Sequence, residues 1–357
     1  MFANKFKDFS QTRCFLFVSC LLIFVLSIFL RSTMDIGSDT GVYLDLGKKV
    51  AMGKKYYFDF FESNFPISFY FYALQYELSQ ILHLSPIILS EIVINLLALW
   101  AIIFAAKILQ RTTIYENKTH YNFIVIAYFL GFFLRPYALQ VGEFGTKTSL
   151  LLLLLFPYIS YSFQPINPWT KRDLVMRGVL MGLMPCIKPH YLILLILVEF
   201  ERFLQKKSLR FLLELDKLVM ALVGAFVLFL MIKFTPEYFE FIPPMWSQTY
   251  ASYADSNVFF QNSWHNMAIM SQFIFVFLLF ARQKISANYT VLILFFISSL
   301  ILISVENLGT IDQIAIFYVI ASICFLKFIF DIFVTDKNIF RENRFIILAV
   351  IFLPIFD

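Results

Sequence analysis

The sequence predicts an all-α polytopic membrane protein, a single transmembrane domain over residues 1–357 with about 11 transmembrane helices. Of its 357 residues, 60% are hydrophobic and 15% are charged, and the mean hydropathy is +0.76. A soluble domain has about 45–50% apolar and about 25% charged residues. Long apolar runs recur along the whole chain and lack the alternation of barrel strands. These observations exclude a soluble globule, a disordered chain and an outer-membrane barrel.

The first apolar run extends from Cys14 to Leu30 and follows three basic residues, Lys5, Lys7 and Arg13. No small-residue cleavage site follows the run, so we interpret it as a retained helix and not as a removed signal peptide. Its basic flank predicts a cytoplasmic N-terminus.

Ten further apolar runs lie at 87–106, 121–138, 148–163, 174–187, 189–203, 217–233, 266–281, 287–304, 311–330 and 345–356. Two places are ambiguous, because 66–82 is long enough to span and 178–198 could form one span around Lys188. The positive-inside rule favours an outside position for 66–82 and a hairpin of two short helices over 174–203. In that arrangement about two thirds of the 29 Lys and Arg residues are cytoplasmic.

Two sizeable external regions result from this topology, a first external loop at 31–86 and a second large external loop at 235–265. The cytoplasmic connections are short and basic, so we expect any chemistry to lie in the external regions. The net charge of +5 follows from this distribution of basic residues and indicates no binding to nucleic acid.

The first external loop is predicted to contain two interfacial helices. Ser38 can cap a helix that ends near Met52, with Gly53 as its stop. A second helix would run over 67–82, after Pro66. The first helix carries an apolar stripe at helical spacing, formed by Val42, Leu46 and Val50. Such amphipathic helices lie in the membrane surface.

Two polar side chains share one face of the first predicted helix. Asp39 falls in its first turn, where the helix dipole favours an ionised carboxylate. Tyr43 lies one turn later. The residues alone leave two interpretations open, a capped surface helix or part of a functional site.

This loop resembles the first external loop of the GT-C glycosyltransferases that use polyprenyl-phosphate sugars, such as the aminoarabinose transferases of lipid A and the protein mannosyltransferase-like family. The resemblance is carried by Asp39, Tyr43, Gly53, the aromatic and acidic stretch 57–62, and Pro66. A GT-C-like fold in the cell inner membrane is the architecture that the resemblance implies.

Two later features agree with the same family, so the resemblance covers about residues 31–200. Glu143 stands in the loop after the third span, and Lys188 separates two short apolar helices. The chain departs from the family pattern at Thr40, where many members have an acidic residue, and at Phe65, where aminoarabinose transferases have lysine.

The resemblance implies transfer of a sugar from a polyprenyl-phosphate donor to an envelope lipid, glycan or protein acceptor on the external, periplasmic face of the membrane. Asp39 would act as the base of an inverting displacement, because an acceptor hydroxyl must lose its proton as it attacks. Lys188 and Arg135 would stabilise the departing phosphate, although either can also be an ordinary membrane-interface residue.

The remaining candidate residues have less defined roles. Glu143 would orient the acceptor, hold a divalent cation with Asp39, or only cap a loop. Tyr43, His190 and His265 would bind substrate, and both histidines also fit a purely structural role. No cofactor is certain, and a divalent cation is the one that the family's chemistry allows.

Other functions remain open from the sequence: a flippase or polymerase of polyprenyl-linked lipids, a transporter, or an inactive GT-C relative. A transporter usually carries ionisable residues within its spans and close, glycine-dependent helix contacts. The chain has only 11 glycines, which argues against such contacts.

Overall fold

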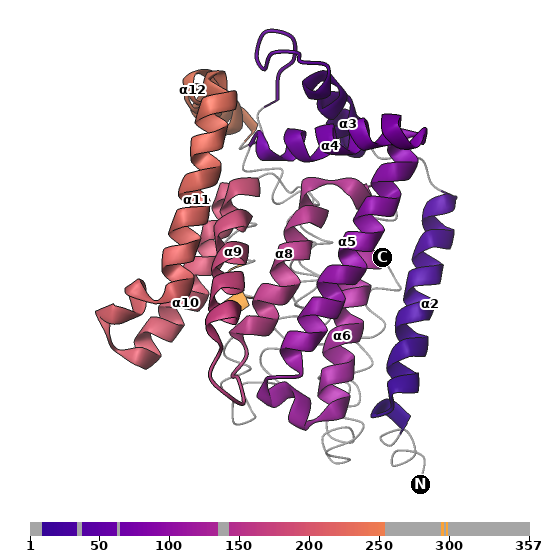
Figure 1. Cartoon of the computed structure of the whole chain (residues 1–357), viewed down its shortest axis with the longest axis vertical. Coiled ribbons are helices and arrows are strands. Elements are labelled where there is room, and N and C mark those ends of the chain that lie inside the picture. The colour runs from indigo at the N-terminus through magenta and orange to yellow at the C-terminus, as the bar shows by residue number, and fades with distance from the viewer. Residues whose placement is uncertain are drawn as a thin grey trace.

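The computed structural model describes residues 9–33, 38–62, 65–134 and 143–253, together with 294, 295 and 298. These residues form helices and no strand. Seven long helices run along the height of the molecule (Figure 1): α2 (Arg13–Ser32), α5 (Pro86–Leu109), α6 (Lys118–Phe133), α8 (Lys147–Ser162), α9 (Lys171–Ile187), α10 (Leu192–Lys206) and α11 (Leu215–Phe234). Four short 3-10 helices connect them: η1 (Thr113–Glu116), η2 (Glu143–Gly145), η3 (Pro189–Tyr191) and η4 (Leu209–Leu213).

Each apolar run predicted before residue 235 is a helix. Three of these helices, α2, α5 and α11, are long and apolar enough to cross a membrane. The others have 15 to 17 residues, and α8 is buried along almost its whole length. A helical membrane protein is therefore supported, and 11 spans remain a prediction. The runs after 265 lie outside the described residues, apart from Leu294, Phe295 and Ser298.

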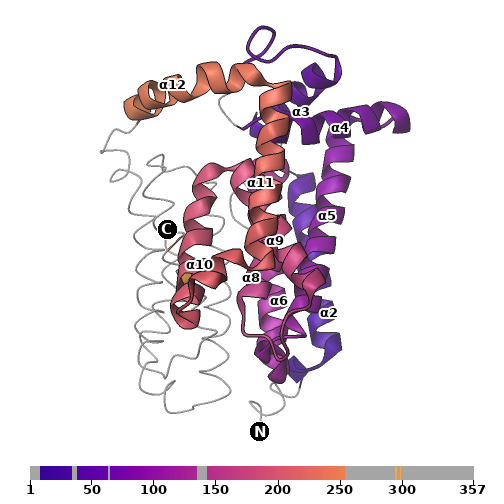
Figure 2. The ribbon, with the colours of Figure 1, turned by 60° about the vertical axis from the view of Figure 1, so that its left-hand side comes forward.

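Three helices lie across one end of the bundle (Figures 1 and 2): α3 (Ser38–Ala51), α4 (Ile67–Leu82) and α12 (Pro236–Tyr253). We call α3, α4 and residues 236–242 of α12 the cap. Helices are present over both ranges predicted for the first external loop, and Gly53 and His83, which both have positive φ, follow their ends. The two predicted external regions therefore meet at the same end of the molecule.

The buried face of α3 differs from the predicted apolar stripe. Val42 is 47% exposed, whereas Tyr43 and Leu46 are buried. The reason is Gly47, which lets α3 approach α4 so closely that an added Cβ would lie 2.5 Å from the Tyr72 carbonyl carbon. Packing against another helix thus decides which side of α3 is buried.

The close contact between α9 and α11 contradicts our expectation that so few glycines would support little close packing. Gly178 and Gly182 are four residues apart on the face of α9 that meets α11. A methyl group at Gly178 would overlap the carbonyl oxygen of Asp216, and one at Gly182 would lie 2.8 Å from that of Met220. This spacing is the small-xxx-small pattern of membrane helix pairs.

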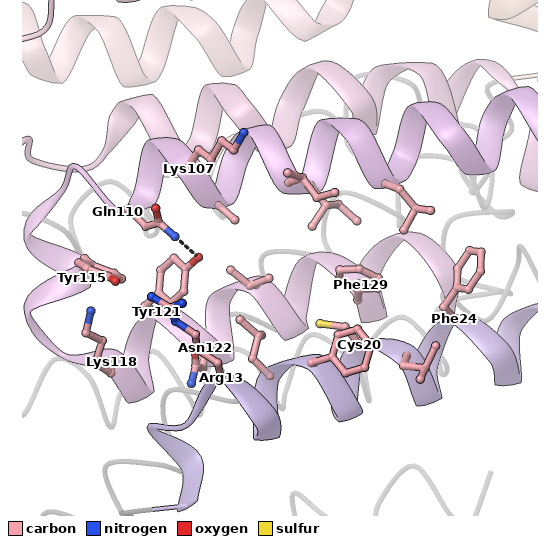
Figure 3. A pocket seen from close by; sticks show the side chains of 18 of the residues that line it. Arg13, Cys20, Phe24, Lys107, Gln110, Tyr115, Lys118, Tyr121, Asn122 and Phe129 are labelled. Carbon is pink, nitrogen blue, oxygen red and sulfur yellow. Dashed lines mark hydrogen bonds between the residues drawn. The ribbon is translucent and has the colours of Figure 1, made fainter.

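Helix α2 stands at the side of the bundle and packs mainly on α6. Near the cap, Arg31 of α2 donates to Glu91 at 2.8 Å and to Asn95 at 3.1 Å, both on α5. Away from the cap a cavity of about 930 Å³ opens between α2, α5 and α6 (Figure 3).

Candidate functional site

The elements of the cap are held to one another by aromatic packing. Tyr43 of α3 stacks on Tyr72 of α4 with ring centroids 5.4 Å apart. The ring centroid of Tyr56, in the loop between these helices, lies 6.1 Å from that of Tyr238 of α12. Burial and the nearby Glu62 carboxylate raise the pKa of Tyr56, so its hydroxyl stays protonated and donates to the Glu62 carbonyl. These contacts join the two predicted external regions.

The first turn of α3 meets η2 underneath the cap. An added Cβ at Gly145 would lie 3.0 Å from the Thr40 methyl group, and the Tyr72 hydroxyl donates to the Gly145 carbonyl. Asp39 adjoins Thr40 in the chain, and Glu143 begins η2. The structure therefore brings together the backbone segments that carry the two predicted acidic residues. The orientation of the Asp39 and Glu143 side chains lies outside what the structure describes.

Sequence reasoning missed Lys147, a buried lysine at this junction. It begins α8, is only 5% exposed, and places its Nζ 5.2 Å from the ring centroid of Tyr43. Burying an ammonium group is costly unless an opposite charge or other polar groups compensate it. A lysine that opens a long apolar helix directly after a predicted acidic loop was the available signal.

Three buried polar side chains near the same end have no hydrogen-bond partner among the described residues: Gln75 of α4, Ser90 of α5 and Thr148 of α8. Ser90 Oγ lies 3.5 Å from the position that a Gly145 Cβ would take. Buried polar groups are usually satisfied, so an unsatisfied group points to water, an ion or a ligand that it binds. These groups could receive the hydroxyls of a polar substrate.

The other predicted site residues are dispersed. Lys188 and His190 lie between α9 and α10, and Lys188 is buried. The last turns of α9 pack against Phe65 and Ile67, beside the start of α4, so Lys188 is also near the cap. Arg135 and His265 are outside the described residues. Among the described residues, no three His, Cys, Asp or Glu side chains are grouped to hold a metal ion.

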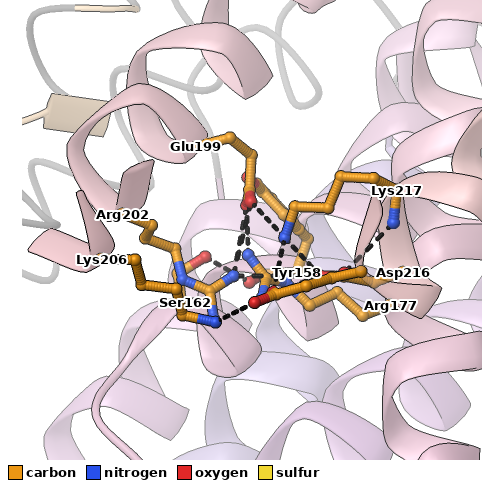
Figure 4. Close-up of polar contacts among 9 residues, drawn as sticks. Tyr158, Ser162, Arg177, Glu199, Arg202, Lys206, Asp216 and Lys217 are labelled. Atoms are coloured by element: carbon orange, nitrogen blue, oxygen red, sulfur yellow. Dashed lines mark hydrogen bonds and ion pairs between the residues drawn. The ribbon is translucent and has the colours of Figure 1, made fainter. Parts of the chain in front are cut away.

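A second group of polar residues was not anticipated, in the half of the molecule away from the cap (Figure 4). We call it the ionic cluster: Tyr158, Arg177, Glu199, Arg202, Asp216 and Lys217. Arg177 of α9 is fully buried and pairs with Glu199 of α10 and, at 3.2 Å, with Asp216 of α11. Its basic and acidic members lie inside or at the ends of apolar runs, which was the available signal.

Each charged member of the ionic cluster forms an ion pair with another member. The Nζ of Lys217 lies 3.0 Å from Glu199 Oε2 and 2.9 Å from Asp216 Oδ2. The Tyr158 hydroxyl donates to Glu199 Oε1 at 3.1 Å. Asp216 and Lys217 stand in the first turn of α11. This arrangement ties α9, α10 and α11 together.

No family model, curated protein or solved structure matches this chain.

Proposed function

We propose that this protein is an integral membrane glycosyltransferase that moves a sugar from a polyprenyl-phosphate donor to an envelope lipid, glycan or protein acceptor. The observation that carries the proposal is the meeting of α3 with η2 above a buried lysine. Asp39 and Glu143 flank this contact, and Tyr43 and Lys147 lie within it. A carboxylate that takes the proton of the acceptor hydroxyl and a buried cation that stabilises the leaving phosphate are the two groups that this transfer needs.

In the proposed reaction an acceptor hydroxyl attacks the anomeric carbon while Asp39 takes its proton. A bond forms between the acceptor oxygen and that carbon, and the bond from the carbon to the phosphate oxygen breaks. The polyprenyl phosphate leaves as an anion, which Lys147 or Lys188 stabilises. Gln75, Ser90 and Thr148 supply hydrogen bonds for sugar or acceptor hydroxyls.

The cap is proposed to face the external, periplasmic side of the inner membrane, with the N-terminus in the cytoplasm. We expect alkaline phosphatase fused after residue 60 or 250 to be active, and fused after 115, 210 or 340 to be inactive. Activity after residue 210 with none after 250 would contradict this orientation.

The function is tested by incubating the purified protein in liposomes with radiolabelled polyprenyl-phosphate sugars and an envelope lipid fraction. We expect transfer of label to an acceptor. Movement of the intact donor lipid across the bilayer without transfer would favour a flippase, and no turnover of any donor would favour an inactive relative.

The two buried lysines allow a sharper comparison in the same assay. We expect Lys147→Ala to raise the apparent KM for the donor and to lower transfer more than Lys188→Ala does, because Lys147 lies against Tyr43. A larger loss with Lys188→Ala would move the phosphate site to the α9–η3 junction. Full transfer by both variants would contradict the assigned role of a lysine.

A further inference from the structure

The cavity between α2, α5 and α6 is a groove with apolar walls (Figure 3). Its volume is about 930 Å³. The walls come from Leu16, Cys20 and Phe24 of α2, from Ile102 and Ala106 of α5, and from Phe129 of α6. Because α2 and α5 are both long and apolar enough to cross a membrane, the groove runs at the depth of lipid chains.

One end of this groove is basic. Arg13, Lys107 and Lys118 line it there, and no Asp or Glu is among the lining residues. None of these three cations forms an ion pair with the part of the chain that the structure describes, although Lys118 lies 3.1 Å from the Tyr115 ring centroid. Three cations at one end of the groove, with no acid among the lining residues, favour an anion there, and the apolar walls beside them favour a hydrocarbon chain.

The basic end of the groove also has polar side chains that are held in place by hydrogen bonds. Gln110 donates to the Tyr121 hydroxyl at 3.0 Å, and Asn122 donates to the Ser10 carbonyl at 2.7 Å. These bonds join the ends of α5, α6 and α2, so the basic residues stand on elements that are held together. The basic end of the groove therefore has its shape before a ligand binds.

The length of the groove identifies its occupant. From Arg13 to Phe24, α2 rises by about 16 Å. The hydrocarbon core of a bilayer is about 30 Å thick, so the groove extends through one leaflet. A phospholipid acyl chain occupies one leaflet, whereas the longer polyprenyl chain of the proposed donor does not match this length.

We propose that this groove binds one anionic phospholipid, with an acyl chain along α2 and its phosphate at Arg13, Lys107 and Lys118. On the predicted topology the lipid belongs to the cytoplasmic leaflet. The site lies at the end of the bundle opposite the cap, so it is separate from the proposed glycosyltransferase site and does not depend on it.

The test measures binding of fluorescent phosphatidylglycerol and phosphatidylcholine to the delipidated full chain in neutral detergent. We expect phosphatidylglycerol to bind at least about tenfold more tightly, because each basic residue contributes about 1 kcal/mol toward an anionic lipid. Lys107→Ala/Lys118→Ala should remove this preference. Lys171→Ala/Arg172→Ala removes two exposed cations from the start of α9, outside the groove, and should retain the preference.

A second variant tests the apolar part without any change of charge. Ala106→Phe fills the groove and should weaken binding of both lipids, while the thermal unfolding temperature of the lipid-free protein confirms that the variant folds. Equal affinity for the two lipids, or an unchanged preference in Lys107→Ala/Lys118→Ala, would overturn the proposal. Competition by inorganic phosphate alone, or tighter binding of polyprenyl phosphate, would also overturn it.

Discussion

The cap and the ionic cluster lie in opposite halves of the molecule, and each is held together by a different kind of interaction. In the cap, stacked rings such as Tyr43 on Tyr72 join α3 to α4. In the ionic cluster, Arg177 and Lys217 bind Glu199 and Asp216 inside the protein. Aromatic contacts tolerate small displacements, whereas a buried ion pair is sensitive to loss of either partner.

The cap is therefore suited to chemistry, and the ionic cluster is suited to stabilising the fold. In or near the cap, Gln75, Ser90 and Thr148 have side-chain hydrogen-bonding groups with no partner among the described residues. In the ionic cluster, each carboxylate is bound by a cation. We therefore expect substitutions in the cap to change activity first, and substitutions in the ionic cluster to change stability first.

The largest expected effect is that of Asp39→Asn on the transfer rate. Asparagine keeps the shape and can still cap α3, so stability should change little. It cannot accept the acceptor proton, so the rate should fall by about 10²–10⁴. Asp45→Asn is the matched control, because Asp45 is exposed and its ion pair is with Lys49, at 2.8 Å on the same helix. Near-normal transfer by Asp39→Asn, with loss in Asp45→Asn or Glu143→Gln, would disprove the assignment.

The next largest effect is expected from Arg177→Met. It removes the fully buried cation that pairs with Glu199 and Asp216, and breaking a buried ion pair costs about 3–5 kcal/mol of unfolding free energy. Denaturant unfolding in detergent measures the change. Arg172→Met, at an exposed position on the same helix, should cost little. An unchanged free energy of unfolding in Arg177→Met would show that this buried arginine does not stabilise the fold.

A smaller loss is expected from Gly178→Ala. Its methyl group would overlap the Asp216 carbonyl oxygen, and overpacking of this kind costs about 1–3 kcal/mol. Gly224→Ala is the control, because no atom lies within 4 Å of an added Cβ there. That variant should be neutral or slightly stabilising, since alanine favours helix. Thermal unfolding of both proteins would separate the two outcomes.

Gly47→Ala tests the effect of overpacking in the cap. The added methyl would lie 2.5 Å from the Tyr72 carbonyl carbon and should displace α3 from α4. We expect transfer activity to fall severalfold while the unfolding temperature changes less than in Gly178→Ala. Gly41→Ala, where an added Cβ has no atom within 4 Å, should keep activity. Equal losses of stability in the Gly47 and Gly178 variants would remove the distinction between the two regions.

The smallest effect concerns Asp173, which caps α9 and is bound by Arg111 through two contacts of 2.7 Å. Burial raises its pKa, but the hydrogen bonds from Arg111 and Thr170 outweigh burial and lower it to about 2. Because the unfolded value is higher, near 3.8, this stabilisation is complete above about pH 4 and is lost as the pH falls toward 2.

Asp173→Asn should therefore be less stable than the wild type at pH 7, and the difference should shrink between pH 4 and pH 2. Thermal unfolding across that range measures it. A constant difference at all pH values would show that the Asp173 carboxylate is not the group that titrates.

The sequence by itself determined the local structure. Among the described residues before 235, apolar runs of adequate length formed helices at the predicted places, and Ser38, Gly53 and Pro66 marked the ends of α3 and the beginning of α4. The hairpin around Lys188 also formed as two helices. These features depend on backbone preferences, capping and hydrophobicity, which act between neighbours in the chain.

Only the tertiary structure decided which of these residues meet. Nothing local pairs Thr40 with Gly145, places Lys147 beside Tyr43, or joins Arg177 to Asp216. The buried side of α3 likewise depends on the close approach of α4 at Gly47, which the spacing of its apolar residues did not indicate. A helix surface can be apolar in several directions, and the shape and charge of the helix packed against it select the one that is buried.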